Sequence, residues 1–233
     1  MTQQTINMPE KIGKLKSKLE NSGWEDIIYP YLDSESFYTT LNKLSDMVQN
    51  GTRFTPPMKN WFRAFETCPY EHLKVVVIGQ DPYPQLGVAD GVSFSCSNTM
   101  KEQPSLRHIF NSLEKQYPGY ERNPDLTRWS EQGVLMLNTA LTVEINKIGS
   151  HYSLWHSFTT ELLTGINNYP SKLVVVLLGK KAQEWQKLLL NHTVIQVEHP
   201  AAAAYKGGVW NYKDLFLTVN KILNDQGKSL INW

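Results

Sequence analysis

Four short aliphatic runs constrain the fold of this 233-residue chain more than any other feature. The runs are LKVVVIG (73–79), VLMLNTA (134–140), KLVVVLLG (172–179) and TVIQVEHP (193–200). Runs that are rich in Val and Leu and lack a regular polar alternation are typical of strands buried on both faces of a sheet. Each run ends in small or polar residues, so the sequence predicts four buried strands that are each followed by a loop.

Segments with the apolar periodicity of helices lie between and after these runs. They span residues 106–113, 154–166, 182–190 and 212–223. Strands that alternate with helices are joined by right-handed crossovers, which produce a parallel sheet between layers of helices. We therefore expect an α/β fold: a single domain over residues 1–233, with a central four-stranded parallel sheet flanked by helices. Residues 1–22 should form an N-terminal extension that is helical or flexible.

The loops that follow the four strands should contain the functional site. In a parallel sheet the carboxyl ends of all strands lie at one edge, and ligands bind there. Asp81, Asn138, Lys180 and His199 each lie at the end of a different run. The sequence therefore predicts an active site at the carboxyl edge of the sheet, where these four residues converge on one cleft.

Three side chains near this edge have both a functional and a structural interpretation. Asp81 can position a water molecule or stabilise developing positive charge, but Asp also favours turns. Tyr83, which is held between Pro82 and Pro84 with their fixed backbone angles, can form a wall of the cleft or cap the core. Phe94 is either a core residue or a platform on which a ring stacks.

Asn138 and His199 have the same two interpretations. An amide offers a donor and an acceptor, which can read the edge of a heterocycle or stabilise a buried turn. His199 precedes Pro200, which favours extended backbone at the end of a strand. A lone histidine is more often structural, but one that shares a cleft with Asp, Asn and Tyr is a candidate catalytic group.

The composition excludes several kinds of site. Cys68 and Cys96 are the two cysteines of the chain; they are too few for a disulfide framework and lack the spacing of zinc or iron–sulfur ligands. We therefore expect a reduced protein without a metal. The sequence contains no GxGxxG, P-loop or GxSxG motif and no zinc-deaminase pattern, which disfavours phosphate cofactors and serine hydrolases.

Charge and hydropathy limit the partners and the cellular location that can be expected for the protein. The net charge of +1 gives no general attraction to nucleic acid, and the lysines within 180–213 either form a basic face or are ordinary solvated side chains. The longest aliphatic run, 173–178, is too short to cross a bilayer. The N-terminus lacks the apolar segment of a secretory signal. We therefore expect a soluble, intracellular protein.

Seven motifs occur in order along the chain: GQDPY (79–83), GVSFS (91–95), QPSL (103–106), LNTALTV (137–143), GSH (149–151), LLGKKAQ (177–183) and HP (199–200). From Trp24 to the C-terminus the chain resembles the uracil-DNA glycosylases, the large GQDPY family of bacteria, eukaryotes and DNA viruses. The lack of a four-cysteine cluster separates it from the iron–sulfur branch of the wider superfamily. The resemblance implies that the chain flips deoxyuridine out of DNA, hydrolyses its N-glycosidic bond and so begins base-excision repair without a cofactor.

The resemblance also implies roles for individual residues. Asp81 orients the attacking water and faces the sugar, and His199 donates a hydrogen bond to uracil O2. The uracil itself is bound by four further residues: Asn138 reads the N3–H and O4 edge, Tyr83 blocks the 5-methyl group of thymine, Phe94 stacks on the base, and Gln80 contributes backbone. The implied contacts to DNA come from Pro104, Ser105, Gly179, Lys180, Pro200, Ala203, Tyr205 and Lys206.

The chain departs from the family pattern mainly in the parts that handle DNA. Pro84 replaces a histidine, and Gly179-Lys180 replaces a Gly-Ser loop. The family motif HPSPLS, whose leucine wedges into the base stack, is replaced by HPAAAAY with Ala203 near the wedge position. We therefore expect a stronger preference for single-stranded DNA than in leucine-bearing relatives, with Tyr205 or Pro200 as alternative wedges.

The expected partners are uracil-containing single- and double-stranded DNA and a proteinaceous uracil-glycosylase inhibitor. We expect a monomer with no membrane contact, in the cytoplasm or, in a viral or eukaryotic setting, in the nucleus. Two other functions remain open from the sequence. One is a DNA-binding replication or repair accessory that keeps the glycosylase fold with secondary activity. The other is an α/β enzyme that acts on another nucleobase or nucleoside.

Overall fold

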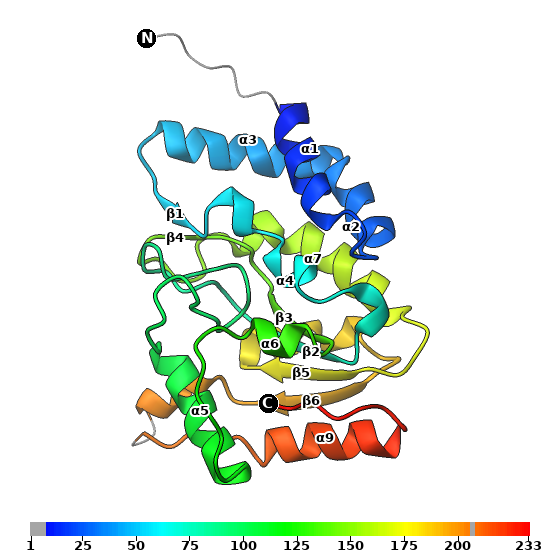
Figure 1. Ribbon diagram of the computed structural model, residues 1–233. Coiled ribbons are helices and arrows are strands. Elements are labelled where there is room, and N and C mark those ends of the chain that lie inside the picture. The colour runs from blue at the N-terminus through cyan, green and yellow to red at the C-terminus, as the bar shows by residue number, and fades with distance from the viewer. Residues whose placement is uncertain (1–7, 206–207) are drawn as a thin grey trace.

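The chain alternates helices and strands around one central sheet (Figure 1). Its structure is a computed structural model that describes residues 8–205 and 208–233, and the side chains of residues 204 and 205 are outside that description. The four strands of the sheet are β2 (Val75–Gly79), β3 (Val134–Asn138), β5 (Val174–Leu178) and β6 (Thr193–Val197). They lie in the order β3-β2-β5-β6, and each neighbouring pair is parallel. The four predicted strands and their parallel arrangement are confirmed.

The pairing register brings the carboxyl ends of the strands together. Gly79 at the end of β2 pairs with Asn138 at the end of β3, and Leu178 at the end of β5 pairs with Val197 at the end of β6. The loops that carry the predicted site residues therefore leave the sheet along one edge.

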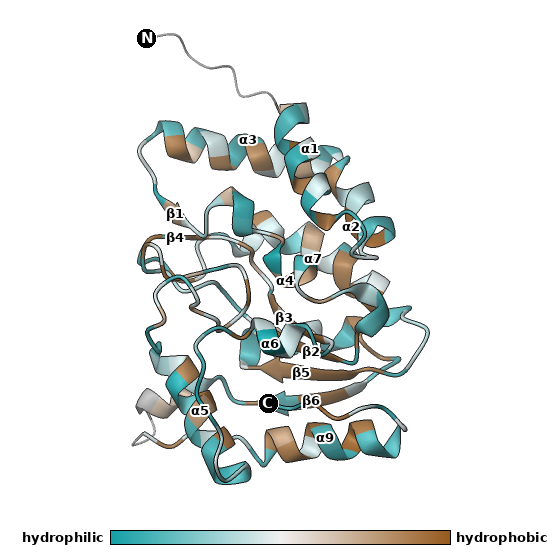
Figure 2. Cartoon of the chain, viewed as in Figure 1, coloured by the Kyte–Doolittle hydropathy of each residue, from teal (hydrophilic) through white to brown (hydrophobic). Residues whose placement is uncertain are grey.

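The two faces of the sheet support two separate parts of the core. Side chains of successive strand residues point to opposite faces, so Val76 and Ile78 pack on one side and Val75 and Val77 on the other. Figure 2 shows β5 as apolar along its length. Burial on both faces explains why β2, β3 and β5 read as continuous aliphatic runs. The edge strand β6 was predicted to be buried as well, but it is only partly buried and includes the exposed Gln196.

Helices cover both faces. On the first face lie α1 (Met8–Leu19), α2 (Glu25–Leu32), α3 (Glu35–Gln49), α4 (Arg63–Glu66) and α7 (Tyr152–Asn167). On the second lie α5 (Pro104–Gln116), α6 (Thr127–Ser130) and α9 (Leu215–Asp225). The remaining helical elements are α8 (Lys180–Gln183) and the 3-10 helices η1 (Met58–Asn60), η2 (Tyr70–His72), η3 (Glu184–Leu188) and η4 (Pro200–Tyr205). A small antiparallel pair joins β1 (Phe54–Thr55) to β4 (Val143–Glu144).

Two predicted helices differ from their expected form. The segment predicted as a helix over 182–190 is the short helix α8 followed by the 3-10 helix η3. The segment predicted over 212–223 becomes helical only at Leu215, because Lys213 and Asp214 adopt left-handed backbone angles that cannot continue a right-handed helix. The helices predicted over 106–113 and 154–166 are present as α5 and α7.

The N-terminal segment packs against the body of the protein. Ile12, Leu15 and Leu19 of α1 are buried, and they belong to the same part of the core as α2 and α7. Within the described residues, no helix combines the length and the apolar character needed to cross a membrane.

Candidate active site

A cavity of about 280 Å³ opens at the carboxyl edge of the sheet. Five of the residues predicted for catalysis or base binding line it, namely Gln80, Asp81, Tyr83, Phe94 and His199. The other lining residues are Pro82, Pro84, Ser105, Ile148 and Ala201. The loop after β2, the first turn of α5, the turn between β4 and α7, and the start of η4 therefore meet at one site. Of the four residues predicted to converge on one cleft, Asp81 and His199 line the cavity, whereas Asn138 and Lys180 are not among its lining residues.

Asp81 is fixed by two hydrogen bonds to one of its oxygens. Gln80 Nε2 donates to Asp81 Oδ2 over 2.8 Å, and the Gly149 backbone N–H donates to the same oxygen over 3.0 Å. The second oxygen, Oδ1, is buried and has no partner among the described residues. Because Asp81 lines the cavity, Oδ1 can accept a hydrogen bond from a water molecule bound there.

The environment of Asp81 raises its pKa. Burial disfavours the charged form and shifts the pKa from 3.8 to about 6, while the hydrogen bonds from Gln80 and Gly149 oppose part of that effect. The carboxyl group is therefore ionised at neutral pH but only poorly hydrated. A carboxylate in this state is well suited to orient a water molecule and to stabilise positive charge on a nearby sugar.

His199 has a defined tautomer. The Ala201 backbone N–H donates to His199 Nδ1 over 3.1 Å, so Nδ1 carries no proton and Nε2 of the neutral ring is a donor. Burial lowers the pKa of His199, which keeps the ring neutral at physiological pH. A neutral imidazole with an N–H at Nε2 can stabilise an oxyanion.

Gly179 allows this imidazole to sit where it does. Its φ of +90° lies in the left-handed region, and a Cβ at this position would lie 2.8 Å from the Cβ of His199. Gly179, which was predicted to contact DNA, is buried and lies against His199. Its structural role here is to let the end of β5 approach His199, which follows β6.

Phe94 and Tyr83 form one unit of the cavity wall. The rings of Phe94 and His199 lie 5.7 Å apart with an interplanar angle of 40°. Tyr83 Oη donates to the Phe94 carbonyl over 3.0 Å. Phe94 itself has a φ of +63°, which is unusual for a bulky residue, and its side chain lines the cavity.

Asn138 lies next to this unit at the end of β3, although it is not among the residues that line the cavity. Ser93 Oγ donates to Asn138 Oδ1 over 3.0 Å. A Cβ at Gly79 would lie 2.7 Å from Ser93 Oγ, 2.9 Å from Asn138 Oδ1 and 3.1 Å from Phe94 Cε2. The absent side chain of Gly79 thus leaves room for the three groups to gather.

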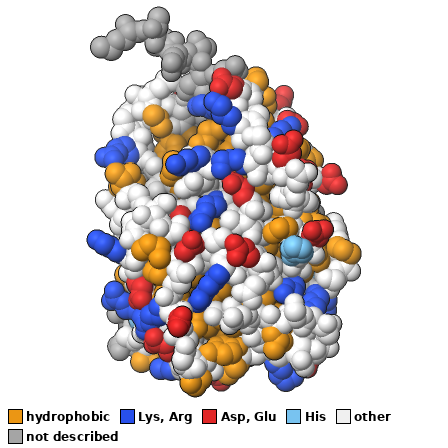
Figure 3. Space-filling model, in the orientation of Figure 1, with side chains coloured by type: hydrophobic (Ala, Val, Ile, Leu, Met, Phe, Trp, Pro, Cys, Tyr) orange, Lys and Arg blue, Asp and Glu red, His pale blue; other side chains and the backbone are white. Residues whose placement is uncertain are grey.

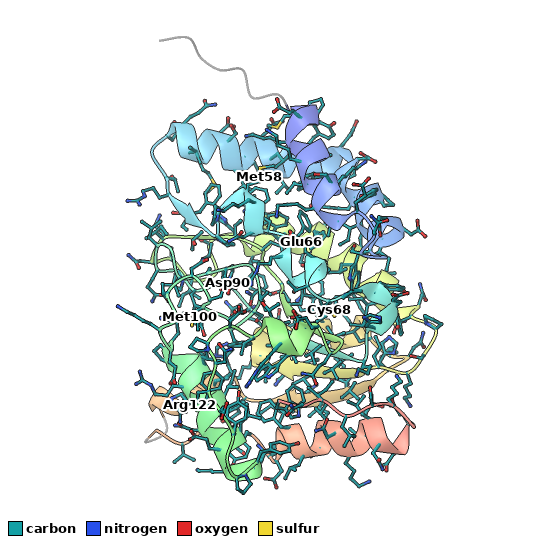
Figure 4. All side chains as sticks on the ribbon, in the orientation of Figure 1. Met58, Glu66, Cys68, Asp90, Met100 and Arg122 are labelled. Carbon is teal, nitrogen blue, oxygen red and sulfur yellow. The ribbon has the colours of Figure 1, made fainter. Side chains whose placement is uncertain are left out.

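The loop that carries Phe94 is anchored by a buried carboxylate. Asp90 is almost completely buried and accepts hydrogen bonds from the Val92 N–H, the Ser95 hydroxyl, and both the N–H and the hydroxyl of Ser97. The Arg63 guanidinium lies 3.0 Å from the same carboxylate. Figure 4 labels Asp90 in the loop region between α4 and α5. Residues 90–97 are therefore held by a fully satisfied ion pair.

Five of the eight predicted contacts to DNA line the cavity, are exposed near it, or lie outside the described residues. Ser105 lines the cavity, and Pro104 and Lys180 are exposed close to this edge. Lys206 and the side chain of Tyr205 lie outside the described residues. Figure 3 shows basic and acidic side chains interspersed over the face that it displays, so that face has no large basic patch.

Ala203 and Pro200, which were predicted to contact DNA, are buried in the structure. Ala203 is only 1% exposed and packs in the second part of the core, because the turn of η4 directs its side chain toward that core. Pro200 is buried as well. The exposed residue of this segment at the cavity is Ala201, which the sequence analysis did not select.

Sequence reasoning missed other residues of the site. Ser93 and Gly149 orient the side chains of Asn138 and Asp81, and both lie inside motifs that were noticed, GVSFS and GSH, without a role. In residues 8–205 and 208–233, no group of three or more His, Cys, Asp or Glu side chains is placed to hold a metal ion.

The fold and the cavity define an α/β enzyme in which a half-buried carboxylate and a neutral imidazole line the same cavity. Comparisons with known proteins place this enzyme more narrowly. The model of the uracil DNA glycosylase superfamily matches residues 65–224, and the chain belongs to this family.

Proteins of this family match nearly the whole chain in sequence and in structure. A uracil-DNA glycosylase of Streptococcus suis (strain 05ZYH33) is 35% identical over 218 residues, which cover 92% of this chain and 99% of the relative. The crystal structure of mimivirus uracil-DNA glycosylase is similar with a TM-score of 0.85 at 26% identity, and the match covers 100% of this chain and 94% of that one. A single-residue variant of the mimivirus protein, in complex with UGI, is similar with a TM-score of 0.84 at 26% identity over 97% of this chain and 92% of that one.

Proposed function

We infer that this chain is a uracil-DNA glycosylase, which hydrolyses the bond between uracil and deoxyribose in DNA. The observation that carries the inference is that Asp81 and His199 line the same cavity. Asp81 has a buried oxygen without a partner among the described residues, and His199 has a hydrogen-bond donor at Nε2. The family membership gives the substrate class. The products are free uracil and an abasic site in the DNA.

We assign the two groups to opposite ends of the breaking bond. Asp81 Oδ1 holds the water that attacks the anomeric carbon, and the negative carboxylate stabilises the positive charge that develops on the sugar. The electron pair of the broken C–N bond leaves with the base, so negative charge builds on uracil O2. His199 Nε2–H donates to that oxygen; one such donor typically contributes about 3 kcal/mol to transition-state stabilisation.

Base selection rests on the groups around Phe94. Asn138 reads the polar edge of uracil, with its amide orientation held by Ser93. Cytosine would leave these buried polar groups unpaired, which discriminates strongly. Tyr83 is tied to Phe94 and stands as the wall that excludes a 5-methyl group. Phe94 stacks on the extruded base.

The protein should act on single-stranded DNA more efficiently than on duplex DNA. Among the described side chains of residues 200–203, Pro200 and Ala203 are buried and the others are alanines, so this segment offers no large wedge for the vacated base stack. Extruding a stacked and paired base costs a few kcal/mol, and a single-stranded base avoids most of that cost. Comparable kcat/KM values on matched single-stranded and duplex oligonucleotides would contradict this proposal.

We further propose that the protein works as an intracellular monomer, in the cytoplasm or nucleus, and that a uracil-glycosylase inhibitor protein binds over the same cavity. The similarity to a mimivirus relative in complex with UGI supports the second part. Inhibitor binding that leaves cleavage unaffected would separate the two surfaces. Light scattering of the purified protein tests the monomer.

The function is tested with purified protein, a uracil-containing single-stranded oligonucleotide, EDTA and alkaline cleavage of the product. Strand scission at the uracil position is expected, with none at thymine or cytosine. Asp81→Asn should retain DNA binding but lose turnover severely, because the lost charge acts mainly in the transition state. DNA binding without any uracil release by the unmodified protein would instead favour a replication accessory.

A further inference from the structure

Ile148 is an exposed apolar side chain at the mouth of the active-site cavity. It is 72% exposed and nevertheless lines the cavity together with Asp81 and His199. Single exposed apolar residues are ordinary on protein surfaces. This one differs because its position brings it close to any nucleotide whose base enters the cavity.

The turn that carries Ile148 is joined by two hydrogen bonds to the loop after β2. The Gly149 N–H donates to Asp81 Oδ2 over 3.0 Å, and the Asn146 N–H donates to the Pro84 carbonyl over 3.0 Å. The position of Ile148 relative to Asp81 is therefore held by hydrogen bonds on either side of it. An apolar side chain on a fixed turn loses little backbone entropy when it meets a ligand.

Among the described side chains, the segment on the opposite rim of the cavity presents none of comparable apolar size. The strands β3 and β6 form the two edges of the sheet. The turn with Ile148 comes after β3 and β4 in the chain, and the segment with Ala201 comes directly after β6. Ala201 is exposed at the cavity, whereas Ala203 is buried. Of the cavity-lining residues in these two segments, Ile148 is thus the one that can bury substantial apolar area against DNA.

We propose that Ile148 contacts the nucleotides that flank the extruded deoxyuridine and supports the flipped state of duplex DNA. The proposal rests on the proposed function and adds a residue that positions the substrate from the β3 side. The contact replaces water on an apolar side chain with the exposed face of a base or sugar, which is favourable in proportion to the area buried.

The test compares Ile148→Ala with Leu190→Ala. Leu190 is a matched control because it is 75% exposed and precedes β6, at the opposite edge of the sheet. Ile148→Ala should lower kcat/KM on duplex uracil DNA about ten-fold, equivalent to about 1.4 kcal/mol. On the matched single strand it should change kcat/KM by less than about two-fold, since a base that is already unstacked needs little support.

A second readout follows the flipped state directly. In an Asp81→Asn background, 2-aminopurine placed beside uracil in a duplex should show a smaller fluorescence increase when Ile148 is also replaced by Ala. Ile148→Leu should restore both the duplex activity and the fluorescence, because it restores apolar area. Leu190→Ala should change neither, and thermal unfolding should be the same for both alanine variants.

Three outcomes would overturn the proposal. Equal losses on single-stranded and duplex DNA would make Ile148 a wall for the base itself. Unchanged activity on both would show that it makes no useful contact. A loss that Ile148→Leu does not restore would mean that shape, and not apolar area, matters. A lack of cleavage by the unmodified protein would refute the proposed function instead, so the two failures are distinguishable.

Discussion

Replacing Asp81 with asparagine should stabilise the fold at neutral pH while it removes activity. Burial raises the pKa of this carboxyl from 3.8 to about 6, so the folded protein holds the charged form at a cost. An asparagine Oδ1 can accept the same hydrogen bonds from Gln80 Nε2 and the Gly149 N–H. The substitution therefore removes the buried charge and keeps its partners.

The size of the stabilisation expected for Asp81→Asn follows from the shift in the pKa of Asp81. A change from 3.8 to about 6 is about 2 pH units, and at about 1.4 kcal/mol per unit it corresponds to about 3 kcal/mol. Because the folded pKa lies above the unfolded one, the protonated group favours the folded state. That contribution is fully present below about pH 4 and is lost as the pH rises through about 6.

The assay is urea unfolding of both proteins at pH 8 and at pH 4. Asp81→Asn should exceed the unmodified protein by about 3 kcal/mol in free energy of unfolding at pH 8, and by less than about 1 kcal/mol at pH 4. Glu121→Gln, in the exposed loop after α5, is the control and should show no such difference. A gap of the same size at both pH values, or no gap at pH 8, would refute the reasoning.

Three further predictions concern catalysis and selectivity. As Asp81 protonates, kcat/KM on single-stranded uracil DNA should fall about ten-fold per pH unit below about pH 6; a flat profile down to pH 5 would contradict its role. Tyr83→Ala should release thymine slowly from thymine-containing oligonucleotides, while Tyr83→Phe should not; the absence of thymine release from the alanine variant, with uracil excision retained, would mean that another residue excludes the methyl group. Gly179→Ala should lower kcat by about 100-fold, because the new Cβ would displace His199, and an unchanged kcat in single-turnover assays would show that the imidazole tolerates the shift.

The layout of the sheet and the location of the site follow from local features of the sequence. The aliphatic runs that end at Gly79, Asn138 and Gly179 are continuous because both faces of their strands are buried. Once four such strands alternate with helices, parallel pairing and the position of the ligand at the carboxyl edge follow from general rules. On that basis the sequence alone places Asp81 and His199 at the same edge of the sheet.

The details that set the chemistry depend on contacts between distant segments. The hydrogen bond from Gly149 to Asp81 joins residues 68 positions apart, and the one from Ser93 to Asn138 joins residues 45 positions apart. Neither glycine nor serine has a distinctive sequence signal for such a role. The tautomer of His199 likewise depends on the path of the chain immediately after it.

The direction of the alanine segment could not be predicted for a similar reason. A run of identical small residues has no amphipathic pattern that shows which side chain is buried. In the structure Ala203 contributes to the core and Ala201 faces the cavity, because η4 turns between them. Among the described side chains of residues 200–203, the lack of a large exposed side chain is therefore a property of the segment and not of one substituted position.

The site combines several unfavourable features, and the surrounding structure compensates for them. Asp81 is held charged in a poorly hydrated place, and Phe94 has a left-handed backbone conformation. Such features persist only where neighbouring contacts determine the conformation. For Phe94 these contacts come from the Asp90 and Arg63 ion pair, whose carboxylate is satisfied by the loop on both sides of the phenylalanine. Both oxygens of Asp90, which anchors the loop, accept hydrogen bonds. Asp81, which acts on the substrate, keeps one oxygen without a partner among the described residues. This difference separates the structural carboxylate from the catalytic one.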